Sequence, residues 1–302
     1  MFSEKAGLNL ENAVVEKDYD FENNFIKDIE AAEAEVFRLN KEYTLRTNID
    51  IFNDTMQIIN SKYYLSNKKL VESTKVYVDG TNHLIPFTDS SRYLPSKLQT
   101  PIKTFLDCST VSAGIIGVDK GYKTAILNFA DGFEKGGLVL KGAPTQEESI
   151  CRCSNLYLSL CSPQAEKEYY DFNRKNNTAS DRLIYSPDVT FVKNGEYETL
   201  KHPVRMDVIS CPAPMGHEAT EDILKHRMKC IVGAAIDNGI ECLVLGAWGC
   251  GVFGNSPEIV AKCFKAVLAD YGGNFKEVFF AIKPNDGDLS DHKLSIFEYE
   301  FM

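Results

Sequence analysis

Residues Leu127 to Ser149, LNFADGFEKGGLVLKGAPTQEES, carry most of the information on fold and chemistry in this chain. A β-strand ends here, a glycine loop follows, and a helix begins with two adjacent glutamates. Such a loop can wrap a phosphate with backbone N–H groups where it enters a helix. Two carboxylates at the helix start can exchange protons with whatever the loop holds. The stretch therefore suggests a hydrolase that acts on a nucleotide-like molecule.

Composition limits the possible partners. The chain has 302 residues, which suits one large domain or one domain with an appendage. Its net charge is −10, and a field of that sign repels nucleic-acid backbones and anionic membranes. We therefore expect no bulk nucleic-acid binding and no membrane partner. Phosphates on a ligand would have to be met locally by oriented N–H groups.

Nine cysteines are scattered along the chain, several of them in apolar segments such as Cys242 to Leu245. A reduced thiol in such a segment behaves as a small hydrophobic group. We recognise no signal peptide and no apolar run near the roughly 20 residues that span a bilayer. We therefore expect a cytoplasmic protein, or a nuclear one if the source is a eukaryote.

Residues 1–100 differ from the rest and are interpreted as a helical N-terminal extension packed on the main domain. Phe25 to Tyr43 carries apolar residues at helical spacing, and Asp50 to Ser61 offers a second helix. Weak strand signals follow within residues 62–100, around Lys75 to Val78. A separate functional module is the alternative.

Residues 101–302 are interpreted as the catalytic domain, because strands and helices alternate from about residue 103. The expected strands are 104–108, 124–129, 204–211, 242–246 and 277–283, and the expected helices are 146–161, 220–238 and 257–271. This alternation predicts an α/β fold with a mostly parallel or mixed sheet and helices on both faces. Ligands of such sheets bind at the carboxyl ends of strands, where both glycine-rich segments fall.

The second glycine-rich segment runs from Gly246 to Asn255, GAWGCGVFGN, between a strand and the helix expected at Pro257. Asn255 or Ser256 can cap that helix, and its first N–H groups form an anion site. The glycines alone would also suit plain tight turns, but two such loops favour phosphate binding. Neither loop matches the dinucleotide-binding or P-loop pattern, which disfavours a redox enzyme or an NTPase.

The pair Glu147–Glu148 has two interpretations. Thr145 and Glu148 fit a capping box that only satisfies N–H groups of the first helical turn. Alternatively, neighbouring carboxylates at a partly buried site raise each other's pKa, so that one carries a proton near neutrality. Adjacent residues cannot flank a bond as the two acids of ordinary glycosidases do. One glutamate would instead donate the proton while the other positions hydroxyls.

These residues resemble the microbial-type poly(ADP-ribose) glycohydrolase family, whose fold is a macrodomain. The resemblance runs from about residue 30 to the C-terminus and is strongest at Asn128–Ala130, Gly136–Ala143, Gln146–Glu148 and Gly246–Asn255. It implies that Glu148 is the catalytic acid/base and that Glu147 and Asn128 bind ribose hydroxyls. It also implies that loop 249–255 holds the diphosphate, with Phe253 near the distal ribose. The substrate-binding residues implied are Asn128, Gly136, Gly137, Gln146, Gly249, Gly251, Val252, Phe253, Gly254 and Asn255, with no metal or other cofactor.

One departure from the family pattern concerns the first loop. The family has three consecutive glycines, whereas this chain has Lys135-Gly136-Gly137-Leu138. Leu138 is expected to narrow or reshape the pocket, which bears on turnover and polymer preference more than on ADP-ribose binding. Lys135 could offer a cation to phosphate, although a loop lysine is more often simply solvated.

Other candidate residues have structural explanations. A helix would point Cys151 and Cys153 about 200° apart, and with His217 they lack zinc-site spacing. Trp248 lies in the second loop, either as a stacking surface or as an anchor of the loop. The aromatic residues Tyr169, Tyr170 and Phe172 could line an adenine slot, with packing as the default.

The sequence therefore predicts a glycohydrolase that releases ADP-ribose from poly(ADP-ribose) or from ADP-ribosylated macromolecules. The alternatives are a reader that binds ADP-ribose without cleaving it and an enzyme on another phosphorylated nucleoside. The acidic net charge slightly favours terminal or single-unit cleavage, because a long anionic polymer would gain little from such a surface.

Overall fold

The computed structural model describes residues 21–83, 102–284 and 291–302. It divides into two units, Met1–Thr44 and Leu45–Met302. The part described in the first unit is helical and belongs to α1 (Phe21–Lys62). The two helices expected near the N-terminus are one helix, because no proline or glycine interrupts residues 43–50. The other expected features of residues 1–20 and 84–100 lie outside the described residues.

The second unit is built on a seven-stranded mixed sheet in the order β1-β4-β5-β3-β6-β7-β2. Strands β5, β3, β6, β7 and β2 are parallel neighbours, while β4 is antiparallel to both β1 and β5. The predicted α/β class and mixed sheet are therefore confirmed. The strands are β1 (Lys75–Tyr77), β2 (Ile102–Leu106), β3 (Thr124–Phe129), β4 (Leu183–Lys193), β5 (Thr199–Cys211), β6 (Cys242–Leu245) and β7 (Glu277–Ala281).

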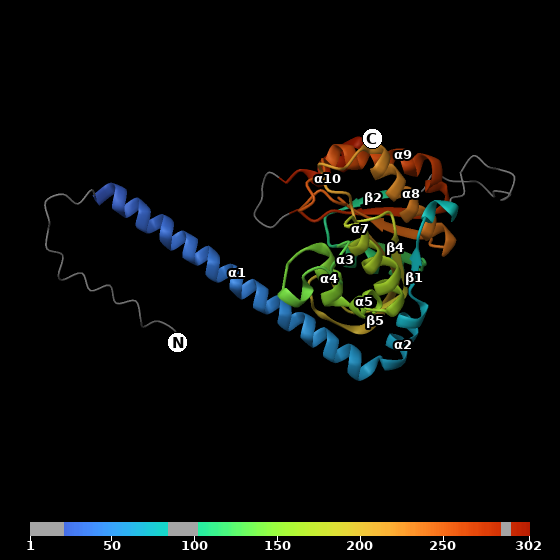
Figure 1. The fold of residues 1–302 in the computed structure, drawn as a ribbon, viewed down its shortest axis with the longest axis horizontal. Helices are drawn as coiled ribbons and strands as arrows, with labels where there is room; N and C mark the ends of the chain where they lie inside the picture. The colour runs from blue at the N-terminus through green and yellow to red at the C-terminus, as the bar shows by residue number, and fades with distance from the viewer. Residues whose placement is uncertain (1–20, 84–101, 285–290) are drawn as a thin grey trace. The chain divides into compact units, whose positions relative to one another are not determined.

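Helices cover both faces of this sheet (Figure 1). Side chains alternate along the buried strands, so that Leu127 and Phe280 join one core cluster while Ile126 and Phe279 join the other. The first cluster includes residues of α8, α9 and α10, and the second includes residues of α3, α4 and α5. The helices are α2 (Tyr64–Ser73), α3 (Thr110–Asp119), α4 (Gln146–Cys153), α5 (Leu156–Leu160), α6 (Pro163–Ala165), α7 (Asp171–Asn176), α8 (Glu221–Asp237), α9 (Pro257–Tyr271) and α10 (Lys293–Phe301).

The helix expected over 146–161 is wrong as one continuous element. It breaks at Ser154, whose backbone is extended and pairs with Phe191 in an isolated bridge. Asn155 completes the break, because its side-chain oxygen accepts the Thr190 N–H at 2.8 Å. Contacts with the neighbouring strand β4 therefore end α4 after two turns.

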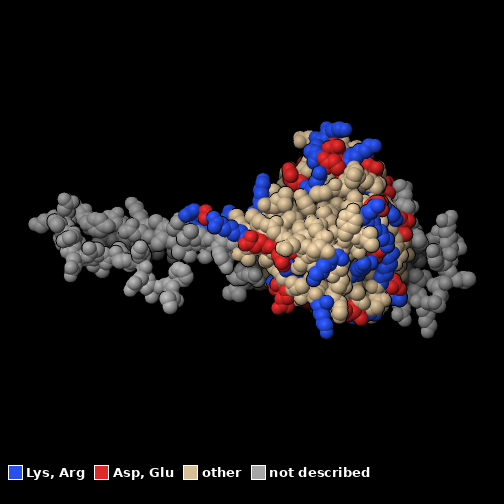
Figure 2. Space-filling view, turned by 90° about the horizontal axis from the view of Figure 1, so that it is seen from below, with Lys and Arg blue, Asp and Glu red and all other residues tan. Residues whose placement is uncertain are grey.

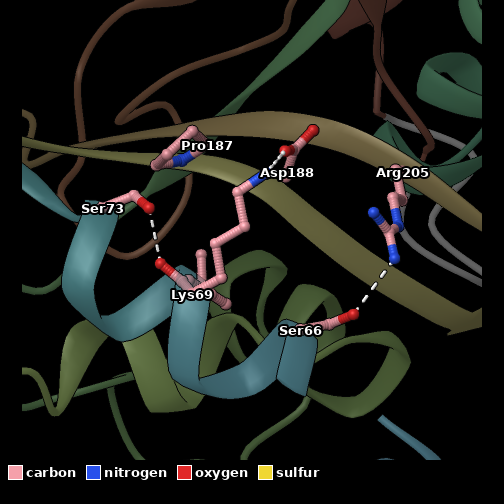
Figure 3. Close-up of a pocket in the computed structure, with 7 residues that line it drawn as sticks. Ser66, Lys69, Ser73, Pro187, Asp188 and Arg205 are labelled. Carbon is pink, nitrogen blue, oxygen red and sulfur yellow. Dashed lines mark hydrogen bonds and ion pairs between the residues drawn. The ribbon is translucent and has the colours of Figure 1, made fainter. Parts of the chain in front are cut away.

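A small hollow between α2 and the β4–β5 pair is shown in Figure 3. Lys69 reaches across it to Asp188 at 3.1 Å, and Arg205 donates to Ser66 at 3.0 Å. Asp188 has φ +53 at a register shift of β4, where the strand bulges. These contacts tie α2 to the bulge, and none of the predicted site residues lines the hollow.

Candidate functional site

Both glycine loops follow the carboxyl ends of parallel strands and so lie on the same side of the sheet. The first follows β3 and the second follows β6, and these strands are parallel neighbours. The two loop starts also approach each other, since a Cβ atom placed on Gly246 would lie 3.0 Å from the Phe129 ring. The predicted juxtaposition at the carboxyl ends of the strands is therefore present, as a ligand site of this fold class requires.

The first loop needs glycine at three positions. Gly136, Gly137 and Gly142 have φ values of +65, +57 and +77. A Cβ atom on Gly137 would overlap Glu148 Oε1 and lie 3.1 Å from Glu147 Oε2, and one on Gly142 would overlap the Leu45 carbonyl. The loop therefore leaves no room for a side chain at Gly137 beside the two carboxylates or at Gly142, which only glycine permits.

Leu138 at the family's third glycine position causes no backbone strain. Its φ is −104 and its ψ is 33, a conformation open to ordinary residues. Its N–H donates to Glu148 Oε1 at 2.8 Å, while its side chain is 43% exposed. Nearby Lys135 forms an ion pair with Glu166 at 2.8 Å instead of remaining free for a phosphate.

Glu148 is held by contacts that a capping box does not explain. It is buried at 4% exposure in the first turn of α4. One oxygen accepts the Leu138 N–H, and the other accepts the Thr145 hydroxyl. Thr145 occupies the N-cap position, yet its side chain makes no capping hydrogen bond. The glycine loop and Thr145 therefore orient this carboxylate, and the cap-only interpretation is wrong.

Glu147 lies in the first turn of α4, beside the end of β3, and is also buried. Asn128 Nδ2 donates to one of its oxygens at 3.1 Å, and the Asp131 N–H donates to the other at 2.8 Å. Burial raises the pKa of Glu147 well above its usual range, and the charges of Glu148 and Asp131 raise it further. The two donors act in the opposite direction. The environment of Glu147 thus favours a bound proton.

Asn128 is fully buried, and its amide nitrogen donates to Glu147 and to Ser210. Its Oδ1 atom has no hydrogen-bond partner among the residues that the structure describes. A buried carbonyl oxygen in this state can accept a hydrogen bond from a hydroxyl that reaches it. Ser210 lies on the adjacent strand β5, and sequence spacing gave no signal for this contact.

Gln146 braces the strand against the helix. Its oxygen accepts the Phe129 N–H at 2.9 Å, and its nitrogen donates to the Leu127 carbonyl at 2.8 Å and to Thr110 at 3.0 Å. Its amide thus joins the end of β3 to the start of α4, so that the carboxylates of the next two residues are held in register with the strand.

The second loop is organised around Asn255. The Asn255 N–H donates to the Gly249 carbonyl at 3.0 Å, and its side chain donates to the Pro214 carbonyl at 3.0 Å. Gly249 has φ +76, and a Cβ atom there would overlap the Asn255 amide. Ser256, one of the two predicted caps, is the N-cap of α9 and accepts the Ile259 N–H.

The outer part of the second loop is exposed. Val252 is 81% exposed, whereas Phe253 is partly buried against the core. Gly254 has φ +70, and within the described part of the chain no atom lies within 4 Å of a Cβ position on Gly251 or Gly254. Protein packing therefore leaves space beside Gly251 and Gly254.

The aromatic candidates are mostly structural. Trp248 is fully buried and donates to the Cys211 carbonyl at 3.0 Å, so it anchors the loop. Tyr169 and Tyr170 are also fully buried in the core, next to each other in an edge-to-face pair. Phe172 lies under the Arg182 guanidinium, 3.6 Å from ring centre to guanidinium carbon.

All nine cysteines are free, and Cys151 and Cys153 are buried. Burial raises the pKa of both thiols, and Cys153 donates to the Asn194 carbonyl. They occupy the core as small apolar groups. Among the described residues, Asp79, His226 and Cys230 are the cluster whose ligand atoms lie close enough together to hold a metal ion.

Arg152 is a buried residue that sequence reasoning did not single out. It is fully buried on α4 and donates to the Ala143 carbonyl at 2.7 Å and to the Tyr197 hydroxyl at 3.0 Å. Tyr197 in turn donates to Ser149. This network connects the end of the first loop to the helix that carries the glutamates. The contacts span long sequence separations, so local patterns could not indicate them.

Charge is unevenly distributed over the face seen in Figure 2, where lysine and arginine side chains gather along one side with acidic groups among them. The net charge of −10 is a sum over the whole chain, and the charge on a single face of the molecule can differ from it. Within the described part of the chain, no helix is both long and apolar enough to cross a membrane.

Comparisons with known proteins agree with this geometry. The family model "Microbial-type PARG, catalytic domain" matches residues 52–194. The poly(ADP-ribose) glycohydrolase of Thermomonospora curvata has a similar structure, with a TM-score of 0.75, 28% identity, and coverage of 85% of this chain and 100% of that one. The poly(ADP-ribose) glycohydrolase of Deinococcus radiodurans, solved in complex with ADP-ribose, matches with a TM-score of 0.68, 31% identity, and coverage of 78% and 96%. No curated protein sequence matched. The chain belongs to the microbial-type poly(ADP-ribose) glycohydrolase family.

Proposed function

We propose that this protein is an ADP-ribosyl glycohydrolase, which releases ADP-ribose from poly(ADP-ribose) or from ADP-ribosylated macromolecules. Membership of the family supports the activity, since similar structures are those of poly(ADP-ribose) glycohydrolases bound to ADP-ribose or to the inhibitor ADP-HPD. The observation that carries the proposal is the packing of Gly137 beside the two buried carboxylates at the start of α4, where a Cβ atom would overlap Glu148 Oε1 and lie 3.1 Å from Glu147 Oε2. A turn this close to two acids places any sugar held by the loop beside a proton donor.

In the proposed mechanism, Glu148 is the acid/base. It protonates the departing oxygen, the bond between the anomeric carbon and that oxygen breaks, and positive charge develops on the ribose ring. Water then attacks the ring carbon and gives its proton to Glu148, which restores the starting state. The Leu138 N–H and Thr145 hydroxyl hold the Glu148 carboxylate in one orientation.

Glu147 and Asn128 are proposed to bind ribose hydroxyls. The unpaired Oδ1 of Asn128 supports this role, because an incoming hydroxyl would satisfy a buried acceptor that the protein leaves open. Gln146 is proposed to act by positioning, since its amide already bonds to strand and helix.

The second loop is proposed to hold the diphosphate. Space beside Gly251 and Gly254 and the nearby N-terminus of α9 support this role. The partly buried Phe253 is proposed to pack near the distal ribose. No residue of this mechanism requires a metal or another cofactor.

The nine free cysteines support residence in a reducing compartment, the cytoplasm or the nucleus. We propose that the enzyme prefers single ADP-ribose units or the ends of the polymer. The support for this preference is the acidic net charge of the chain, which would repel a long anionic polymer.

The test is a product assay with two substrates, auto-modified polymer and mono-ADP-ribosylated protein, followed by chromatography of free ADP-ribose. The wild type should release product, and Glu148→Ala should lose about 10²–10⁴-fold in rate while its calorimetric affinity for ADP-ribose stays within a few fold. A wild type that binds ADP-ribose without product is a reader, which contradicts the proposal. Cleavage by Glu148→Ala at the wild-type rate would contradict the assigned acid.

A further inference from the structure

A group of three potential metal ligands lies apart from the glutamates and both glycine loops. Asp79 follows β1 and begins the turn into the short 3-10 helix Gly80–His83, which packs on α8 (Figure 1). His226 and Cys230 lie on α8 one turn apart, at positions i and i+4 that share one face. One ligand atom from each of the three residues lies within 4.8 Å of the other two.

The spacing fits a single tetrahedral ion. Cys230 Sγ lies 3.8 Å from Asp79 Oδ1 and 3.9 Å from His226 Nε2. A tetrahedral zinc ion with ordinary Zn–S, Zn–N and Zn–O bonds holds such ligand pairs about 3.6 Å apart. The two distances from Cys230 Sγ are therefore within a few tenths of an ångström of this spacing, and the third pair, Asp79 and His226, lies within 4.8 Å.

The surroundings hold these side chains in place. A Cβ atom on Gly80 would overlap the Cys230 carbonyl, so the turn is pressed directly against α8. The Thr81 N–H and hydroxyl both donate to Asp79 Oδ1, at 2.8 and 2.6 Å, and fix its orientation. Hydrogen bonds of this kind to a ligating carboxylate are usual in metal sites.

The donor set and its exposure favour a borderline divalent cation. Cys230 is fully buried, whereas the His226 side chain is 44% exposed, so an ion has an open side to enter from. Water can supply the fourth ligand from this open side. One sulfur, one nitrogen and one or two oxygens suit Zn²⁺ better than Mg²⁺ or Ca²⁺, which take oxygen ligands.

We propose that Asp79, His226 and Cys230 form a structural zinc site that fastens the turn after β1 to helix α8. On binding, the Sγ–Zn bond forms, the S–H bond breaks and the thiol proton passes to solvent. The ion would link an early segment of the chain to a late one, since Asp79 and Cys230 are 151 positions apart. This site is independent of the proposed glycohydrolase function.

The test uses the full chain after chelator treatment, titrated with Zn²⁺ against a chromophoric chelator and, separately, with Co²⁺ to detect thiolate-to-metal absorption. One tight equivalent of Zn²⁺ and a thiolate band with Co²⁺ are expected. Cys230→Ser should abolish the band, and His226→Ala and Asp79→Asn should each weaken Zn²⁺ binding at least about tenfold. Zn²⁺ should raise the Tm of the wild type but not that of Cys230→Ser.

Matched controls are Cys263→Ser, a buried thiol on α9, and His202→Ala, an exposed imidazole on β5. Both should keep the wild-type stoichiometry and affinity. Absence of a tight equivalent in the wild type would overturn the proposal, and so would binding that survives Cys230→Ser and His226→Ala together. If Cys230→Ser does not fold, His226→Ala decides the question, because its side chain lies at the surface.

Discussion

The two glycine loops leave neighbouring strands at one edge of the sheet, but their glycines are needed for different reasons. In the first loop, Gly137 is pressed against the carboxylates of Glu147 and Glu148. In the second loop, Gly249 is pressed against the Asn255 amide, and the outer glycines face open space. Acidic side chains thus set the backbone of the first loop, whereas a neutral amide and backbone hydrogen bonds set that of the second.

From this difference we expect the first loop to affect the chemical step and the second loop to affect substrate binding. A change in the first loop moves carboxylates, so it should appear in kcat, while a change in the second loop moves N–H groups, so it should appear in KM. If glycine-to-alanine changes in the two loops altered kcat and KM in the same way, this division of roles would be wrong.

Gly137→Ala should have the largest effect. The new methyl group overlaps Glu148 Oε1 and forces that carboxylate away from the Leu138 N–H. We expect kcat for ADP-ribose release to fall about 10²–10⁴-fold, the range of general acid catalysis. The control is Gly121→Ala, because Gly121 also has positive φ, +81, but no atom within 4 Å of its Cβ position. Equal loss of kcat in both variants would mean that backbone strain alone is responsible.

Gly249→Ala should raise KM about tenfold and change kcat less. The methyl group displaces the Asn255 amide, which then loses its bond to the Pro214 carbonyl. Steady-state kinetics with ADP-ribosylated substrate and a thermal melt measure both effects. Gly239→Ala provides the control for backbone strain, since Gly239 has φ +65 and free space. A pure kcat defect in Gly249→Ala would contradict a binding role for this loop.

Glu147→Gln should change how stability depends on pH. The pKa of Glu147 is higher in the folded state than in the unfolded state. Protonation of this carboxyl therefore stabilises the folded wild type, and the full effect is present below the unfolded pKa of about 4.3. That stability is lost as pH rises through the folded pKa. We therefore expect Glu147→Gln to gain stability relative to the wild type between pH 4 and pH 8, measured as the difference in Tm across that range.

The exposed Glu72 provides the control, because Glu72→Gln should leave the pH profile of Tm unchanged. A constant difference between Glu147→Gln and the wild type at every pH would contradict the raised pKa. The second loop contains no carboxylate between Gly246 and Asn255, so no equivalent pH effect is expected from it.

Gly251→Ala should have the smallest effect, a few-fold rise in KM with an unchanged Tm. Among residues 21–83, 102–284 and 291–302, no atom lies within 4 Å of the new methyl group, so a ligand that approaches the backbone would meet it. Leu65→Ala, at an exposed position on α2 outside both glycine loops, is the control and should leave KM unchanged. If Gly251→Ala has the wild-type KM, the ligand does not approach the loop at this residue.

The sequence predicted the bounds of an element correctly where neighbouring residues alone determine where that element begins and ends. The bounds of β3 (124–129) and α9 (257–271) agree with the structure. In β3 the buried run is continuous, and in α9 Ser256 and Pro257 mark the start. The neighbouring glycine loops and the burial of the glutamate pair also followed from strand ends and spacing.

The failures have both local and long-range causes. Strand β4 was not predicted, because Ser186-Pro187-Asp188 interrupts its apolar pattern at the bulge. Helix α3 was also missed, since small residues obscure its apolar face. Nor could the sequence indicate that the Leu138 N–H donates to Glu148, because the two meet only after the loop folds, and it paired Thr145 with Glu148 only as a capping box.

The contact of helix α1 with the first loop has a practical consequence for shortened forms of this protein. Asn48 donates to the Gly142 carbonyl at 2.8 Å, the Leu45 carbonyl touches Gly142, and Thr55 donates to the Arg152 carbonyl near the end of α4. The family match begins only at residue 52. A recombinant fragment that begins at residue 52 would keep every proposed reacting group but would lose Asn48 and Leu45, which both contact Gly142. Shortened forms should therefore begin before Leu45.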